Sequence, residues 1–340
     1  MVSERPRRSV RSVLSSALVS LLRFAFDATV LPVALLVIAS HFGDRAWLFD
    51  MTTFFRPHIA ALALALVVLG LLARSLPRLV GAVLLFAAAL YPLLVPVAPM
   101  AATAAQANFR VMSANLMGGE NNDTEAFRKL VVAEAPDIVV AQEVVPAWRP
   151  TLSSLEGYPY TAGPEFTDGE STVMVASRYP IRAAQLFWQA HLEGGPAPGA
   201  IPLRIHVARP APQKPLIVFA IHPPTPRAYR DWKSRNAYLE QVVVQAVREG
   251  PDAEVIVVGD WNTPYWSPFF ARTVDGAGLR TTEGAWPAPT RVFQEFGAPD
   301  MLGPPIDHVA VSPSIGVKAL RVGGHFGSDH LPLIVDLELP

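Results

Sequence analysis

Cysteine is absent from the 340-residue chain, which excludes disulfide bonds and thiolate metal sites. Acidic side chains are scarce in one part of it: residues 1–100 hold four Asp/Glu against nine Lys/Arg. Residues 101–340 hold 25 Asp/Glu against 19 Lys/Arg. The net charge of −1 therefore combines a basic first part with an acidic second part.

The acidic second part lacks the excess of basic side chains that non-specific binding to a nucleic-acid backbone requires. One basic run, made of Arg227, Arg230, Lys233 and Arg235, keeps nucleic acid open as a partner. The same run is interpreted as the solvated face of a helix, or as a contact for lipid headgroups. Charge therefore disfavours nucleic acid without excluding it.

Long apolar stretches dominate the first hundred residues. They are Val13–Phe42, Ile59–Ala73 and Leu79–Val97. A bilayer core of about 30 Å takes roughly 20 helical residues to span, so the second stretch needs flanking residues. Within the first stretch, Arg23 and Asp27 lie four residues apart and are expected to pair on one helical face. The sequence predicts a membrane anchor with three transmembrane helices over residues 1–100, followed by a linker over residues 101–107.

Basic side chains give the anchor an orientation. Those that flank the stretches on one side are Arg5, Arg7, Arg8, Arg11, Arg74 and Arg78. The positive-inside rule places them in the cytoplasm, so that three spans leave the C-terminal domain outside. The expected location is the bacterial inner (plasma) membrane, multi-pass, with the domain on the external (periplasmic) side. Ala105-Gln106-Ala107 resembles an A-x-A cleavage site, so release of the domain is kept as an alternative.

Residues 108–340 have the strand and helix signals of one α/β (α+β) domain. Apolar runs rich in β-branched residues predict strands at 109–115, 137–142, 171–176, 203–208, 216–221, 254–259, 306–311, 317–322 and 331–337. Asp123 or Thr124 can cap a helix that extends to Glu134, and residues 227–248 form a second helical segment. Strands outnumber helices, and the count fits a four-layer α/β sandwich with two packed mixed β-sheets.

Polar side chains lie where these predicted strands begin or end, which is where sites collect in sheet proteins. They are Asn115, Glu143, His222, the Gly259-Asp260-Trp261-Asn262 motif, Asp307-His308 and Ser328-Asp329-His330. Carboxylate and amide oxygens suit a hard cation such as Mg²⁺, which keeps waters for a substrate phosphate. Imidazoles add general acid–base capacity near neutral pH.

The ordered set of motifs resembles the endonuclease/exonuclease/phosphatase (DNase I-like) superfamily over residues 108–340. The resemblance implies that Glu143 ligates Mg²⁺ or Mn²⁺ with help from Asn115 and Asp329. It also implies roles in binding the phosphate and in proton transfer for further residues. His222 would contact the phosphate or leaving oxygen, Asp260 and Asn262 would orient the phosphate and the attacking water, and Asp307 would hold the catalytic imidazole of His330. Met117 departs from the pattern, because many nucleases have an acidic residue there.

A finer resemblance involves the segment from Gly259 to Phe269 and the His-Pro-Pro-Thr-Pro after Ile221. Both are similar to a bacterial membrane-bound branch that includes VanJ-type and YafD-type proteins. The expected function is a divalent-metal-dependent phosphodiesterase or phosphatase acting on a lipid-linked phosphate or diphosphate, with membrane lipids as partners. A membrane-anchored endonuclease or nucleotide phosphodiesterase is the alternative, and a non-enzymatic binding module is a third reading.

Overall fold

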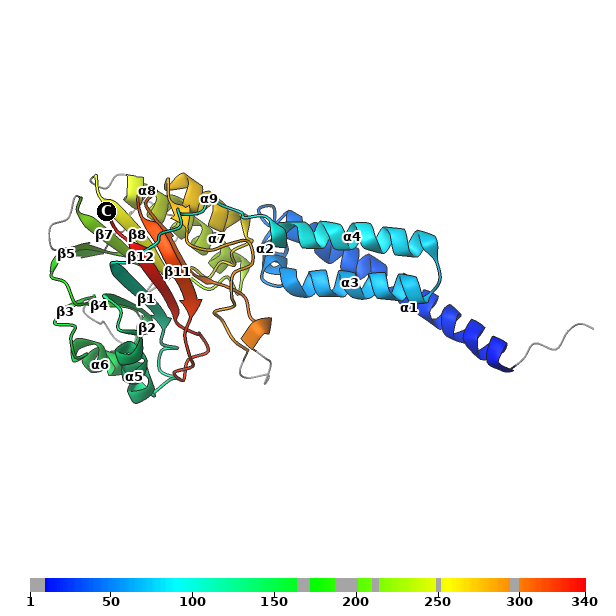
Figure 1. Cartoon of the computed structure of the whole chain (residues 1–340), viewed down its shortest axis with the longest axis horizontal. Helices are drawn as coiled ribbons and strands as arrows, with labels where there is room; N and C mark the ends of the chain where they lie inside the picture. Colours follow the sequence, from blue (N-terminus) through cyan, green and yellow to red (C-terminus); the bar gives the residue numbers. More distant parts are fainter. Residues whose placement is uncertain (1–9, 164–171, 187–200, 210–213, 249–251, 294–299) are drawn as a thin grey trace, which may run out of the picture. The chain divides into compact units, whose positions relative to one another are not determined.

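The computed structural model describes residues 10–163, 172–186, 201–209, 214–248, 252–293 and 300–340. The chain divides into two compact units, Met1–Val95 and Pro96–Pro340. Figure 1 shows that the first unit is helical and that the second contains the β-sheets. Of the basic residues used to orient the anchor, Arg5, Arg7 and Arg8 lie outside the described residues.

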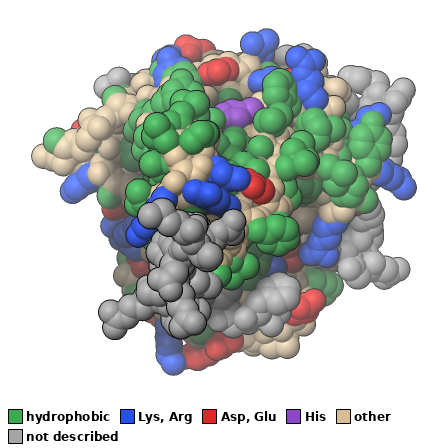
Figure 2. All heavy atoms as spheres, turned by 90° about the vertical axis from the view of Figure 1, so that its right-hand side faces the viewer, with side chains coloured by type: hydrophobic (Ala, Val, Ile, Leu, Met, Phe, Trp, Pro, Cys, Tyr) green, Lys and Arg blue, Asp and Glu red, His purple; other side chains and the backbone are tan. Residues whose placement is uncertain are grey.

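The first unit has four helices. They are α1 (Val10–His41), α2 (Trp47–Thr53), α3 (Arg56–Leu72) and α4 (Leu76–Leu94). Two helical segments, Ser16–His41 and Leu76–Leu94, are long and apolar enough to cross a membrane. A third crossing is present if α2 and α3, which bend by 77° at their junction, form one span. Most of the exposed large hydrophobic side chains of the described residues belong to these helices. Figure 2 shows one face of the molecule, on which hydrophobic side chains are widespread and basic side chains gather in groups.

The expected pairing of Arg23 with Asp27 within one helix is wrong. Arg78 of α4 donates to both carboxylate oxygens of Asp27, at 2.9 and 2.6 Å. Arg23 instead donates to the backbone carbonyl of Ala73, at 3.2 Å. Spacing along one helix shows which residues share a face, but neighbouring helices supplied the nearer partners here.

The second unit contains two six-stranded sheets. In chain order the strands are β1 (Phe109–Asn115), β2 (Ile138–Val144), β3 (Tyr160–Ala162), β4 (Thr172–Ser177), β5 (Ile181–Leu186), β6 (Leu203–Val207), β7 (Leu216–Ile221), β8 (Glu254–Asp260), β9 (Arg280–Thr281), β10 (Asp307–Val311), β11 (Gly316–Val322) and β12 (Leu333–Glu338). One sheet has the order β11-β12-β1-β2-β4-β3, and the other has the order β5-β6-β7-β8-β10-β9. Both are mixed, because β1–β2 and β7–β8 are parallel and the other pairs are antiparallel.

Helices lie outside the sheets. They are α5 (Thr124–Glu134), η1 (Pro146–Trp148), α6 (Arg149–Ser153), α7 (Tyr229–Ala237), η2 (Tyr238–Val243), α8 (Val244–Arg248), α9 (Pro268–Gly276) and η4 (Asp300–Leu302). One buried apolar cluster combines residues of both sheets, including Val140, Val218 and Val335. A second packs the outer face of β1 and β2 against Phe127 and Trp148 of α5 and η1. The predicted α/β sandwich of two packed mixed sheets is confirmed (Figure 1).

Three strands, β3, β5 and β9, were not expected from the sequence, because each is short or lacks a buried apolar face. The predicted strand 171–176 corresponds to β4, and residue 171 lies outside the described residues. The predicted helix 227–248 begins at Tyr229 and contains a π-helical segment, η2. These differences leave the strand ends that carry the polar motifs in place.

The segment before β1 pairs with an edge strand of each sheet. Ala101 N–H donates to Thr281 of β9 at 2.8 Å, and Ala104 N–H donates to Val317 of β11 at 2.9 Å. β9 and β11 are the outer strands of their sheets. Residues 101–107, expected to be a linker, therefore contribute backbone hydrogen bonds to the fold of the second unit.

Candidate active site

Strand register brings the polar motifs of both sheets together. Asn115 ends β1 and pairs with Gln142 of β2, which places Glu143 one residue farther along. In the other sheet, Asp260 at the end of β8 lies opposite Asp307 at the start of β10. A Cβ on Gly259 would lie 2.0 Å from the carbonyl oxygen of Ile221. Glycine therefore lets β8 approach β7 immediately before Asp260.

Asn115 links the two sheets through its side-chain amide. Its Nδ2 donates to Glu143 Oε1 at 3.0 Å and to Asp260 Oδ2 at 3.1 Å. Its Oδ1 accepts from the backbone N–H of Met117 at 2.9 Å. Asn115 thus holds one carboxylate of each sheet, while its oxygen supports the turn after β1.

Two residues of the site have left-handed backbone conformations, Glu143 with φ of +53° and Asn262 with φ of +47°. Such conformations cost free energy for non-glycine residues and collect at functional sites. The backbone N–H of Asn262 donates to Asp260 Oδ1 at 2.8 Å, and its side chain donates to the carbonyl of Pro223 at 3.0 Å. These bonds fix the Asn262 amide beside Asp260 and the segment that follows β7.

Asp307 and His330 form a buried pair, with His330 Nδ1 donating to Asp307 Oδ2 at 2.8 Å. His330 Nε2 lies 3.8 Å from Asp260 Oδ2. Burial alone would lower the pKa of His330, but the carboxylates of Asp307 and Asp260 raise it to about 9. Burial and the charge of Asp307 raise the pKa of Asp260 to about 6. At neutral pH His330 is therefore protonated, and its imidazolium ring faces Asp260.

His222 aims a ring nitrogen at two carboxylates. Its Nε2 lies 3.7 Å from Glu143 Oε1 and 3.7 Å from Asp260 Oδ2. The same nitrogen is buried and has no hydrogen-bond partner among the residues that the structure describes. Potential ligand atoms of Glu143, His222 and Asp260 all lie within 4.8 Å of one another. A buried nitrogen without a partner beside two carboxylates fits a divalent cation, and its ligand set would be mainly oxygen.

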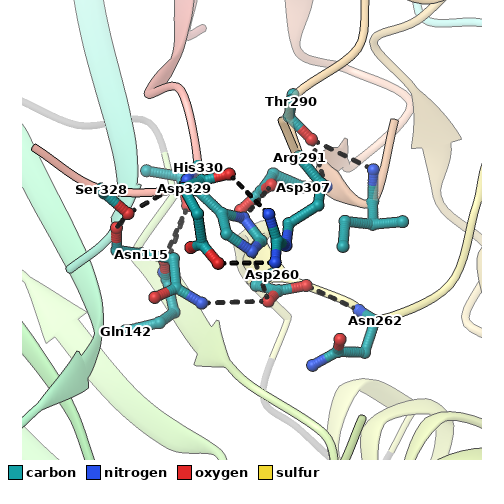
Figure 3. Close-up of polar contacts among 12 residues, drawn as sticks. Asn115, Gln142, Asp260, Asn262, Thr290, Arg291, Asp307, Ser328, Asp329 and His330 are labelled. Atoms are coloured by element: carbon teal, nitrogen blue, oxygen red, sulfur yellow. Dashed lines mark hydrogen bonds and ion pairs between the residues drawn. The ribbon is translucent and has the colours of Figure 1, made fainter. Parts of the chain in front are cut away.

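The three residues of the Ser328-Asp329-His330 motif make different contacts (Figure 3). Ser328 Oγ donates to the carbonyl of Asn115 at 2.7 Å and accepts from His330 N–H at 3.0 Å. It therefore ties the His330 loop to β1. Asp329, expected to assist the metal, forms an ion pair with Arg291 at 2.6 Å. Among the described residues, two groups of side chains could hold a metal ion, namely Glu143, His222 and Asp260, and Asp260, Asp307 and His330. Asp329 belongs to neither group.

The sequence did not identify the segment Thr290–Val292, which lies beside Asp307 at the start of β10 and beside the loop that contains His330. Thr290 Oγ1 accepts from the backbone N–H groups of Ile306 and Asp307, each at 3.1 Å. The backbone of Thr290 accepts from Leu331 N–H at 2.7 Å. The segment thereby joins the Asp307 strand to the His330 loop. A local sequence motif does not predict contacts between residues so far apart in the chain.

Arg235 is the exception in the basic run interpreted as a solvated helix face, whose other members, Arg227, Arg230 and Lys233, are exposed. Its side chain is completely buried. Its Nη1 donates to the carbonyl of Asn262 at 2.9 Å and to Thr263 Oγ1 at 2.7 Å. This arginine supports the Asn262 loop and adds nothing to a basic outer surface.

Comparison with known proteins identifies the family of the chain. The sequence profile of the "Endonuclease/Exonuclease/phosphatase family" matches residues 112–330. The chain belongs to this family of phosphoester hydrolases. A search of curated proteins found no match.

Solved structures share the fold. An endonuclease/exonuclease/phosphatase from Bacteroides vulgatus is 18% identical with a TM-score of 0.56, over 68% of this chain and 99% of that one. A functionally unknown conserved protein from Enterococcus faecalis V583 is 16% identical with a TM-score of 0.57, over 68% and 100%. Truncated Caenorhabditis elegans TDP2 is 15% identical with a TM-score of 0.54, over 67% and 96%. At these identities the likeness establishes the fold alone.

Proposed function

We propose that the protein is a membrane-anchored, divalent-metal-dependent phosphoester hydrolase that acts on a lipid-borne phosphate or diphosphate. The observation that carries the catalytic part is the convergence of Glu143, His222 and Asp260 on one point, with the Asp307–His330 pair beside it. Mg²⁺ or Mn²⁺ bound there would neutralise charge on the phosphoryl oxygens. Glu143, Asp260 and His222 are the residues placed to hold it.

The side chains around this point supply the remaining chemistry. Asp260, whose carboxylate a bound cation would keep deprotonated, can accept a hydrogen bond from an attacking water and orient it. His330, protonated and oriented by Asp307, can stabilise charge on the phosphoryl group and give a proton to the leaving oxygen. Asn262 is placed beside Asp260 to hold a phosphoryl oxygen. Asp329 would join the metal ligands only by leaving Arg291.

The apolar helices of the first unit support a membrane location. Arg74 and Arg78 follow α3 and lie at the start of α4, and the positive-inside rule assigns that end to the cytoplasm. The catalytic unit is then external. Only Val95–Ala98 separate α4 from Pro99, whose carbonyl accepts from β9. In a membrane, so short a connection would limit how far the catalytic unit can move from the lipids, which would give lipid substrates a high effective concentration.

The charge of the catalytic part favours a lipid over nucleic acid. It has six more acidic than basic residues, and one of its arginines, Arg235, is buried. An acidic surface repels a polyanionic backbone.

Reporter fusions test the orientation. A fusion after Gly43 and another after Asn108 should score as external, and a fusion at Ser75 should score as cytoplasmic. A cytoplasmic signal at Asn108 would reverse the compartment and favour an intracellular substrate.

The substrate class is tested with the full-length protein reconstituted in liposomes with Mg²⁺. We expect release of phosphate from an embedded polyprenyl diphosphate at a higher rate than cleavage of plasmid DNA. His330→Ala in the same liposomes controls for contaminating activity. Efficient cleavage of DNA with no hydrolysis of any lipid phosphate would replace the lipid substrate with nucleic acid.

A further inference from the structure

A second histidine–carboxylate pair lies on the other face of β10. Successive strand residues point to opposite faces, so Asp307 points toward the site and His308 points away from it. His308 packs there against Glu283, and their side chains are 0% and 2% exposed. The pair is sealed from solvent, whereas the cluster around Glu143 is partly open.

Both ring nitrogens of His308 are engaged. Nδ1 lies 2.7 Å from Glu283 Oε2, and Nε2 lies 2.8 Å from the carbonyl oxygen of Thr263. A carbonyl oxygen only accepts, so Nε2 must carry a hydrogen and donate it to Thr263. Burial opposes protonation, but the Glu283 carboxylate and its hydrogen bond raise the pKa of His308. Glu283 therefore fixes the protonation state in which His308 can hold Thr263.

Aromatic neighbours fix the ring of His308. The centroid of Phe270 lies 4.5 Å from that of His308, and Trp261 meets the ring edge-on at 5.7 Å. Both neighbours are completely buried. Because the ring cannot turn away, its Nε2 stays directed at Thr263.

Thr263 directly follows Asn262, and the two residues are held as a unit. Arg235 donates to the carbonyl of Asn262 and to Thr263 Oγ1, and His308 donates to the carbonyl of Thr263. The segment is held in this way although Asn262 has a φ of +47°. Without these donors, the backbone of Asn262 could lower its free energy by leaving the left-handed region.

We infer that Glu283 and His308 are positioning residues that keep Asn262 in its functional conformation by holding the peptide that follows it. This inference rests on the proposed role of Asn262 toward the phosphoryl group. His308 and Glu283 are buried on the face of β10 away from the site, and His308 contacts Thr263, so both act through Asn262. Their removal should therefore slow the chemical step without weakening metal binding.

His308→Phe and Glu283→Gln test the inference in the detergent-solubilised full chain, with bis(4-nitrophenyl) phosphate and Mg²⁺ as the probe. Phenylalanine keeps the aromatic packing and removes the donor, so kcat should fall about tenfold, the usual value of one hydrogen bond. KM and the Mg²⁺ requirement should change little. Glutamine at position 283 can donate to Nδ1 and leave the hydrogen on Nε2, so Glu283→Gln should retain most of kcat, whereas Glu283→Ala should not.

Tyr158→Phe is the control, because it also removes a buried hydrogen-bonding group, which donates to the carbonyl of Pro136 and accepts from Arg178. It should lower the unfolding temperature without lowering kcat. In an Asn262→Ala background, His308→Phe should have no further effect on kcat, since residues that act through one another are not additive. An undiminished loss in that background, or a fully active His308→Phe, would overturn the inference.

A readout without turnover separates this inference from the proposed function. The side-chain amide signal of Asn262, in protein labelled with ¹⁵N-asparagine and assigned with Asn262→Ala, should shift in His308→Phe and stay in place in Tyr158→Phe. If the wild type hydrolyses no phosphoester but the signal shifts, the proposed function fails and the positioning stands. An unmoved signal in His308→Phe would show that His308 does not position Asn262.

Discussion

Two histidine–carboxylate pairs use adjacent residues of β10, and they differ in what surrounds them. Both pairs are buried. The first, Asp307–His330, lies beside Asp260, and we call it the open pair because His330 Nε2 faces that carboxylate at 3.8 Å. The closed pair, Glu283–His308, has both ring nitrogens hydrogen-bonded and is enclosed by aromatic rings. We therefore propose that a histidine–carboxylate pair takes part in the reaction where a ring nitrogen remains available, and has a structural role where both ring nitrogens are hydrogen-bonded.

Removing the histidine of the open pair should have the largest effect. We expect His330→Ala to lower kcat by about 10²–10⁴, because it removes acid–base or charge-stabilising help from the transition state. The closed-pair variant His308→Phe should lose far less. Steady-state kinetics of both variants measure the ratio, and equal losses would remove the distinction between the pairs.

Glu143→Gln should raise the Mg²⁺ concentration needed for half-maximal activity by about 10–100-fold, since a neutral amide binds a hard cation less well. Glu143→Ala should nearly abolish turnover. A Mg²⁺ titration of initial rates measures this shift, with Glu283→Gln as the carboxylate-to-amide control of the closed pair. An unchanged titration in Glu143→Gln would show that the cation binds elsewhere.

The pH profile should depend on Asp260. Its pKa is raised to about 6, and the deprotonated form is the one that can accept a proton, so kcat/KM should fall as pH drops through that region. A cation beside Asp260 stabilises the carboxylate, so the acid limb should move to higher pH when Mg²⁺ is limiting. If the pH of the acid limb does not change with the Mg²⁺ concentration, Asp260 does not contact the metal.

The smallest effect concerns the stability of the closed pair. The pKa of His308 is raised above its ordinary value of 6.5, so its pairing stabilises the fold fully below pH 6.5. That contribution is lost as pH rises through the raised pKa. Glu283→Gln should thus destabilise the protein by about 1–3 kcal/mol at pH 6 and by less at pH 9. Thermal unfolding at both values checks the sign, and a larger loss at pH 9 would contradict it.

Local sequence patterns predicted much of the fold and most of the residues that lie in the candidate site. Alternating apolar runs marked the central strands, and polar residues at the ends of those runs marked Asn115, Glu143, His222, Asp260 and Asp307. Strand ends are readable because burial and turn chemistry act within a few residues. The structure then showed that register brings these ends together.

Contacts that depend on packing between distant segments were not predictable in the same way. Arg235 belonged to a run with the spacing of a solvated face, yet it is buried against Asn262. Arg291 and Glu283 lie in segments without a regular pattern, and their partners are 38 and 25 residues away. Only the alternation of Asp307 and His308 within an apolar run carried a signal for the closed pair.

The most direct test is hydrolysis of bis(4-nitrophenyl) phosphate by the detergent-solubilised full chain, measured with Mg²⁺, after excess EDTA, and after Mg²⁺ is restored. We predict hydrolysis that stops with the chelator and returns with the cation, because a site made of two carboxylates and one imidazole holds Mg²⁺ loosely. Undiminished hydrolysis in excess EDTA would contradict the account of a metal site formed by Glu143, His222 and Asp260.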